Sequence, residues 1–122
     1  MPVITNEVAS KFAQEWLEAW NSHDLEAILS HYAEDVCFAS PYIVAILGEE
    51  SGVIEGKASL RRYWQLGLER IPDLHFELVS ILTGINRITI YYQGHAGMVA
   101  ESFQFDVTGK VIEAFACYAL KT

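Results

Sequence analysis

The sequence predicts an α+β fold in which three N-terminal helices pack on one face of an antiparallel sheet. Up to about residue 70, apolar residues recur at helical spacing, whereas from residue 74 onward they fill strand-length runs divided by short turns. Strands joined by such short connections form hairpins, so we expect an antiparallel meander. Because the chain has 122 residues, no internal repeat and no linker, we expect one domain spanning residues 1–122.

The three helices are expected over residues 7–20, 25–32 and 57–70. In the first, apolar side chains recur every four residues, which is typical of an amphipathic helix: Val8, Phe12, Trp16 and Trp20. Asp24 is of a residue type that often caps a helix, and it directly precedes the second one. The third has an inner face formed by Leu60, Trp64 and Leu68.

Between the second and third helices the pattern predicts little regular structure. We expect one short strand over residues 36–39, which Ser40 and Pro41 end, and then an apolar loop from Tyr42 to Gly56 that glycines interrupt. Four more strands are expected after the third helix, over residues 74–82, 87–93, 98–107 and 111–120.

The strand over residues 111–120 is apolar on both of its faces. The helices can cover one face, and the other needs a second cover. A symmetric partner subunit supplies such a cover, and twofold dimers are the commonest solution. We therefore expect a homodimer.

Glu101 interrupts an apolar column in the third strand of the meander. Because strand side chains alternate between faces, it shares one face with Val99, Phe103, Phe105 and Val107. A carboxylate on a face meant for burial is costly unless it is paired, protonated or functional. We single it out as a candidate general acid or base. The alternative is a carboxylate that forms an ion pair, or one that faces solvent because the register shifts by one residue.

Composition excludes several classes of protein. A formal net charge of -8 argues against binding nucleic acid, which needs a basic face to neutralise phosphates. No apolar run reaches the roughly 18 residues that span a bilayer, and the N-terminus lacks the layout of a secretory signal. We therefore expect a soluble cytoplasmic protein that binds neither nucleic acid nor membranes.

The cysteines and histidines do not predict a metal site. Cys37 and Cys117 lie in apolar surroundings, so we expect both to be reduced and buried. Four histidines occur without a second ligand cluster at metalloenzyme spacing: His23, His31, His75 and His95. The sequence also has no phosphate-binding loop and no nucleophile elbow. We expect no metal and no cofactor.

Several short motifs follow one another over nearly the whole chain. They are WNSHD at 20–24, YAED at 32–35, GKASLRRYW at 56–64, IPDL at 71–74, FD at 105–106, GKV at 109–111 and Tyr118. Their order and spacing resemble the SnoaL-like branch of the NTF2-like superfamily. The resemblance implies a curved antiparallel sheet that three helices wrap into a cone, usually dimeric, whose open end holds a small, mostly apolar ligand.

That superfamily includes ketosteroid isomerases, polyketide cyclases, epoxide hydrolases, dehydratases and non-catalytic transport factors, so fold does not give the activity. The aspartate base that precedes a proline in ketosteroid isomerases matches Ser40, and the oxyanion-binding tyrosine of the first helix matches Trp16. The protonated aspartate of the third long strand matches Glu101. A serine without its own base does not remove a proton from carbon, and an indole is a weaker donor than a phenol. We therefore do not expect steroid isomerisation.

Strand periodicity and the resemblance thus select the same carboxylate. Tyr92 and Tyr118 are candidate hydroxyl donors beside it. The candidate ligand-binding residues are Trp16, Trp20, Phe38, Ser40, Tyr42, Trp64 and Phe103. For the aromatic ones among them, a place in the hydrophobic core is an equally good explanation of the pattern.

Our leading hypothesis is a protein that binds a small hydrophobic or aromatic molecule in an apolar cavity. As an enzyme, it would use Glu101 to move a proton in a cofactor-independent isomerisation, cyclisation or hydration. The alternative is a non-catalytic binding or interaction module whose pocket only sequesters a ligand or stabilises a dimer.

Overall fold

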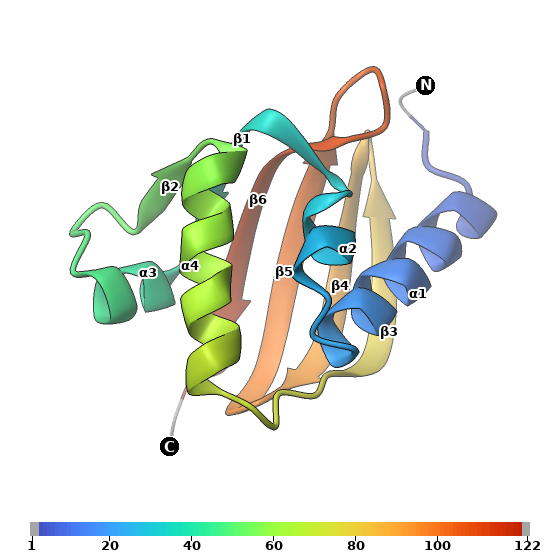
Figure 1. The fold of residues 1–122 in the computed structure, drawn as a ribbon. Coiled ribbons are helices and arrows are strands. Elements are labelled where there is room, and N and C mark those ends of the chain that lie inside the picture. The colour runs from blue at the N-terminus through green and yellow to red at the C-terminus, as the bar shows by residue number, and fades with distance from the viewer. Residues whose placement is uncertain (1–2, 121–122) are drawn as a thin grey trace.

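A six-stranded mixed sheet in the order β2-β1-β6-β5-β4-β3 carries the fold, and α1, α2 and α4 lie across one of its faces (Figure 1). The computed structural model describes residues 3–120. The elements are α1 (Asn6–Asn21), α2 (Leu25–Leu29), β1 (Tyr32–Ala39), α3 (Pro41–Leu47), β2 (Val53–Glu55), α4 (Lys57–Arg70), β3 (Glu77–Gly84), β4 (Arg87–Gly94), β5 (Gly97–Phe105) and β6 (Val111–Tyr118). The predicted α+β class is confirmed.

The two long helices form where the apolar spacing predicts them. Thr5 begins α1 as its N-cap, and its hydroxyl accepts a hydrogen bond from the Val8 amide at 3.2 Å. Phe12, Trp16 and Trp20 are buried on the side of α1 that faces the sheet. α4 spans the predicted residues 57–70. Within residues 3–120, no helix is long and apolar enough to cross a membrane.

The second helix is shorter than predicted, and the following strand is longer. α2 ends at Leu29, and Tyr32, expected at the end of this helix, begins β1. Tyr32 pairs with Val111 of β6, whose amide donates to the His31 carbonyl at 2.8 Å. Pairing with a strand distant in sequence, together with complete burial of the Tyr32 ring, outweighs the local helical pattern.

The segment predicted as a loop from Tyr42 to Gly56 contains a helix and a strand, so that prediction is wrong. Ser40 caps α3 by accepting a hydrogen bond from the Tyr42 amide at 3.2 Å, and Pro41 occupies the first turn. Gly48 ends the helix in a left-handed conformation, with φ of 70°. β2 then pairs antiparallel with β1.

Strands β3 to β6 form the predicted antiparallel meander, but the sheet as a whole is mixed because β1 pairs in parallel with β6. The end of β5 also differs from the prediction. Val107 does not continue the apolar column, since β5 ends at Phe105 and the Val107 side chain is fully exposed. Asp106 starts a turn there, accepting hydrogen bonds from the amides of Thr108 and Lys110.

Among the described residues, no helix covers the opposite face of the sheet (Figure 1). Tyr91 and Phe115 are exposed on this face, 38% and 42% respectively, and so is the Cys117 thiol. The expectation that both cysteines are buried is therefore wrong in the single chain, where Cys37 is half-buried. Alternation puts Cys117 on the side of β6 opposite Ala116, which packs in the core.

Candidate functional site

A cavity of about 410 Å³ lies between α3, α4 and the inner face of the sheet. Its walls are mainly apolar. The aromatic part of the lining is Trp20, Phe38, Tyr42, Tyr63, Trp64 and Phe76. The polar residues that reach the cavity are Glu101, Tyr92 and Tyr118 on the sheet, with Arg70 and His95 at the ends of α4 and β4. The cavity thus combines a hydrophobic volume with few polar groups, as ligand sites usually do.

Glu101 lies at the centre of the sheet, on its inner face. It pairs with Ile90 of β4 on one side and with Ala116 of β6 on the other, and its side chain is only 5% exposed. Within residues 3–120, no arginine, lysine or histidine forms a salt bridge with it. The carboxylate therefore occupies an apolar site without a compensating positive charge.

Tyr92 is the hydrogen-bond partner of this carboxylate: its hydroxyl donates to Glu101 Oε1 at 2.9 Å. Burial raises the pKa of Glu101 to about 7, and the hydrogen bond from Tyr92 opposes that rise. Burial also raises the pKa of Tyr92, and the nearby Glu101 charge raises it further. At neutral pH the carboxyl group is thus divided between its two protonation states, while Tyr92 keeps its proton.

The second carboxylate oxygen is open to the cavity. The one hydrogen bond that described residues make to the carboxylate uses Oε1. Within the same residues, one side-chain N or O atom is both fully enclosed and without a hydrogen-bond partner, and that atom is Trp20 Nε1, not Glu101 Oε2. Glu101 Oε2 is thus neither hydrogen-bonded nor fully enclosed in this part of the chain, and Glu101 lines the cavity.

Tyr118 is held at the cavity by residues around α3. Its hydroxyl lies 3.4 Å from Ser40 Oγ, and its ring packs against Tyr42 with centroids 4.3 Å apart. Burial raises the pKa of Tyr118, and the Glu101 charge adds to that rise. Ser40 is itself buried, caps α3 and stands behind the lining. Ser40 thus anchors both a helix and a tyrosine.

Trp16 and Phe103, two predicted ligand contacts, lie in the core behind the cavity wall. Trp16 Nε1 donates to the Tyr32 hydroxyl at 3.0 Å, so the indole is not directed to Glu101. Phe103 packs edge-on against Trp16 and Phe12. Neither residue is part of the lining, whereas the other predicted aromatic contacts are: Trp20, Phe38, Tyr42 and Trp64.

Several lining residues were not among the sequence predictions. Tyr63 and Phe76 add aromatic surface, while Arg70 and His95 add the basic groups. The sequence did offer one indication of the cavity wall, namely Gly67. A glycine inside a helix destabilises the helix relative to alanine, so its presence there calls for a reason. A Cβ atom built on Gly67 meets nothing within 4 Å, so the missing side chain leaves room at the cavity wall.

The arrangement suits proton transfer. A carboxyl group with a pKa near the ambient pH both accepts and donates protons efficiently. The tyrosine hydroxyls stay protonated and can donate hydrogen bonds to a charge that develops on a ligand. Among the described residues, no group of three or more His, Cys, Asp or Glu side chains could hold a metal ion.

A SnoaL-like domain matches residues 13–119. A SnoaL-like protein of unknown function from Burkholderia thailandensis E264 is 45% identical, with a TM-score of 0.93 over 98% of this chain and 100% of that one. No curated protein shows a significant match.

More distant structures share the fold. A SnoaL-like family protein from Agrobacterium tumefaciens C58, provisionally named an isomerase, is 15% identical, with a TM-score of 0.72 over 92% of this chain and 97% of that one. A protein with a ketosteroid isomerase-like fold from Catenulispora acidiphila, solved in complex with trimethylamine, is 16% identical, with a TM-score of 0.70 over 90% and 86% of the two chains. The match over residues 13–119 and the 45% identity to the Burkholderia protein together show that the chain belongs to the SnoaL-like family.

Proposed function

We propose that the cavity binds a small hydrophobic or aromatic carbonyl compound and that Glu101 transfers a proton on it without a cofactor. One observation carries the proposal: a buried carboxylate, with no cation beside it, presents a free oxygen to an apolar cavity. Keeping a charged group in such a place lowers stability, and reactivity is a common reason for it. The reaction class is isomerisation, cyclisation or hydration.

In the isomerisation form, Glu101 Oε2 removes a proton from the carbon next to the ligand carbonyl. The electron pair of that C–H bond moves into an enolate, and the carbonyl oxygen gains the negative charge. In a ligand with a carbon–carbon double bond β,γ to the carbonyl, the enolate is conjugated with that bond, so the Glu101 carboxyl group returns the proton to the γ carbon, the double bond moves next to the carbonyl and the carboxylate is regenerated.

The tyrosines have separate roles in this scheme. Tyr92 keeps its hydrogen bond to Oε1 and thereby orients the carboxylate. Tyr118 lines the cavity with a hydroxyl whose long 3.4 Å contact to Ser40 leaves it available to a ligand oxygen. A hydrogen bond from Tyr118 to the carbonyl would stabilise the enolate charge as it forms.

The structural neighbours support the binding part of the proposal at the level of fold. The Catenulispora protein was solved in complex with trimethylamine, and the Agrobacterium protein is provisionally named an isomerase. Both are under 25% identical to this chain. The proposal therefore rests on the cavity and on Glu101.

Proton exchange in D2O tests the proposal directly. A panel of cyclic and aromatic ketones is incubated with the protein, and loss of the NMR signal from protons next to the carbonyl is followed. We expect exchange with the wild-type protein and none with Glu101→Gln, which keeps the shape of the side chain but cannot take a proton. Glu113→Gln, on the exposed side of β6, is the matched control.

Each outcome of this experiment tests a different part of the proposed function. Full exchange by Glu101→Gln would refute the role of this carboxylate. Ketone binding without exchange in the wild-type protein would leave a non-catalytic binding module. Absence of binding across the panel would contradict the carbonyl ligand class itself.

We further infer that the open face of the sheet joins two chains into a homodimer. The pairing register puts Leu82, Thr89, Ser102 and Phe115 in one row across this face, and Leu82 and Phe115 are exposed by 54% and 42%. Phe115→Lys should dissociate the dimer in sedimentation velocity experiments, whereas Val44→Lys, an exposed apolar position on α3, should not. A stable wild-type monomer at micromolar concentration would contradict the dimer.

A further inference from the structure

The charged groups of the cavity lining are unevenly placed. Glu101 is the acidic residue and lies on the central strand β5, buried against the sheet. The basic residues, Arg70 and His95, are both exposed and lie at the last residue of α4 and in the turn after β4. The remaining lining is neutral. The cavity therefore has its acidic residue at the floor and its basic residues at the rim.

Arg70 has no protein partner in the part of the chain that the structure describes. Its side chain appears in no hydrogen bond and no salt bridge there, whereas most other basic side chains have a partner: Lys57, Arg61, Arg62, Arg87 and Lys110. Among the lysines and arginines of residues 3–120, Lys11 is the other exception. An arginine without a partner is unexpected in this chain, because its 16 acidic residues outnumber its 8 basic ones.

A guanidinium group binds carboxylates and similar anions through a planar pair of N–H donors. The Glu101 charge disfavours an anion at the floor, so an anionic group on a ligand belongs at the rim. We propose that the cavity takes an amphiphilic organic anion, whose apolar body fills the aromatic part while Arg70 binds its charged group. This rests on the proposed function only in that the cavity binds a small molecule.

His95 supports the same orientation. It follows Gly94 in the β4–β5 turn and lies among lining residues, and its ring N–H would add a second donor to the anion. Arg70 alone is the primary determinant, because its charge does not depend on pH.

Two fluorescent probes of nearly the same shape test the inference. 8-Anilinonaphthalene-1-sulfonate carries an anionic group, and N-phenyl-1-naphthylamine is its neutral counterpart without the sulfonate. We expect Arg70→Gln to weaken binding of the sulfonate about fivefold, the size of a partly solvated ion pair, and to leave the neutral probe unchanged. Arg70→Lys should retain part of the preference.

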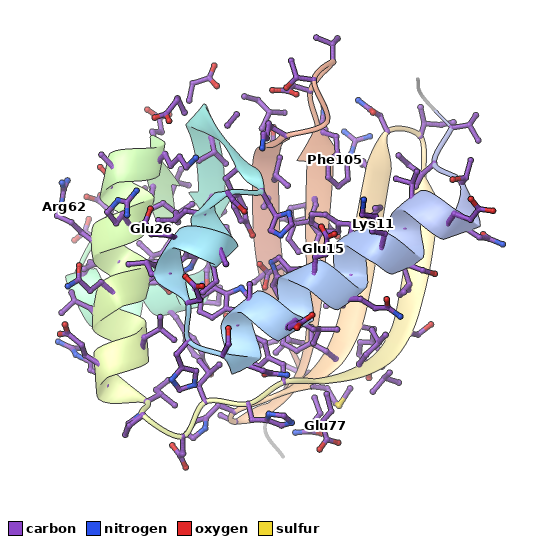
Figure 2. All side chains as sticks on the ribbon, turned by 45° about the vertical axis from the view of Figure 1, so that its right-hand side comes forward. Lys11, Glu15, Glu26, Arg62, Glu77 and Phe105 are labelled. Atoms are coloured by element: carbon purple, nitrogen blue, oxygen red, sulfur yellow. The ribbon has the colours of Figure 1, made fainter. Side chains whose placement is uncertain are left out.

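Two further variants control the experiment. Arg62→Gln removes an exposed arginine of the same helix, on the side that points away from the sheet (Figure 2), and should change neither affinity. Gly67→Leu puts a side chain into the cavity and should abolish binding of both probes, which locates them there.

The outcomes separate the two proposals. Tight binding of the neutral probe with no Arg70-dependent preference for the sulfonate would overturn the inference and leave the apolar cavity intact. Equal loss of both probes in Arg70→Gln would show that Arg70 supports the wall only, which also overturns it. If neither probe binds, or if Gly67→Leu leaves both bound, the inference fails, whereas the proposed function is still decided by the ketone panel.

Discussion

The Tyr92 hydroxyl donates to Glu101 Oε1 at 2.9 Å along a diagonal of the β4–β5 pair. Tyr92 lies opposite Val99, and Glu101 lies opposite Ile90, so the two side chains are diagonal neighbours on the inner face. The register of one hairpin thereby sets both the burial of the carboxylate and its hydrogen bond. These two effects act in opposite directions on its protonation.

The first prediction removes that hydrogen bond. In Tyr92→Phe the stabilisation of the charged carboxylate is lost, so the pKa of Glu101 should rise above its value of about 7. The carboxyl ¹³C shift of Glu101, followed by NMR over pH, measures it. Tyr91→Phe, one position along the same strand on the open face, should leave the pKa unchanged. An unchanged pKa in Tyr92→Phe would contradict the tuning role.

The second prediction concerns stability and pH. Because the pKa of Glu101 is about 7 in the folded protein and 4.5 is its ordinary value, the folded state holds this proton more tightly than the unfolded state. The stabilisation from protonation is therefore complete below pH 4.5 and is lost as the pH rises through 7. Glu101→Gln, which stays neutral, should gain stability relative to wild type by about 2–3 kcal/mol between pH 5 and pH 8.

Urea denaturation at pH 5 and pH 8 measures this gain as the change in the free energy of unfolding. Glu113→Gln, on the exposed side of β6, should show no comparable pH-dependent gain. A difference between Glu101→Gln and wild type that is equal at both pH values would show that the carboxyl group does not titrate abnormally.

The third prediction concerns Gly67 on α4. Since a Cβ atom at this position meets no neighbour within 4 Å, Gly67→Ala should stabilise the protein by about 0.5–1 kcal/mol through helix propensity and chain entropy. Thermal denaturation measures the shift. Ser59→Ala on the same helix removes no glycine and serves as the comparison. Destabilisation by Gly67→Ala would mean that the wall has no free space there.

The fourth prediction tests the buried bond between Trp16 and Tyr32. Tyr32→Phe removes the acceptor of the Trp16 indole N–H, which is left enclosed without a partner, so the protein should lose about 1–3 kcal/mol. The free energy of unfolding in urea measures the loss. Replacing Trp16 by Phe should lower the free energy of unfolding less in the Tyr32→Phe variant than in the wild-type protein, because in that variant no hydrogen bond remains to be broken.

Much of the fold follows from local pattern. The spacing of apolar residues predicts α1 and α4, and alternation predicts the inner-face position of Glu101, because both features depend on side chains a few residues apart. The ends of elements were less predictable. Tyr32 joins a strand through its pairing with Val111, which no local window contains.

The cavity was predicted only in part for the same reason. Its rim is formed by the end of α4, by α3 and by the turn after β4, which come together only in three dimensions. Arg70 and His95 have no shared motif in the sequence, so their common position could not be predicted. Ser40 followed by Pro41 is also a typical helix start, but we interpreted the pair only as the end of a strand.

The parallel pairing of β1 with β6 has a consequence for the order in which the protein folds. Ser40 and Tyr118 are 78 positions apart in the chain, yet their hydroxyl oxygens lie 3.4 Å apart. Contacts between such distant residues require a large loop to close, and they slow folding. On the ribosome, the helices and β1 therefore emerge well before the strand that completes their sheet, and their apolar faces remain exposed until β6 arrives. We expect this interval to be the time at which the nascent chain is most prone to aggregate.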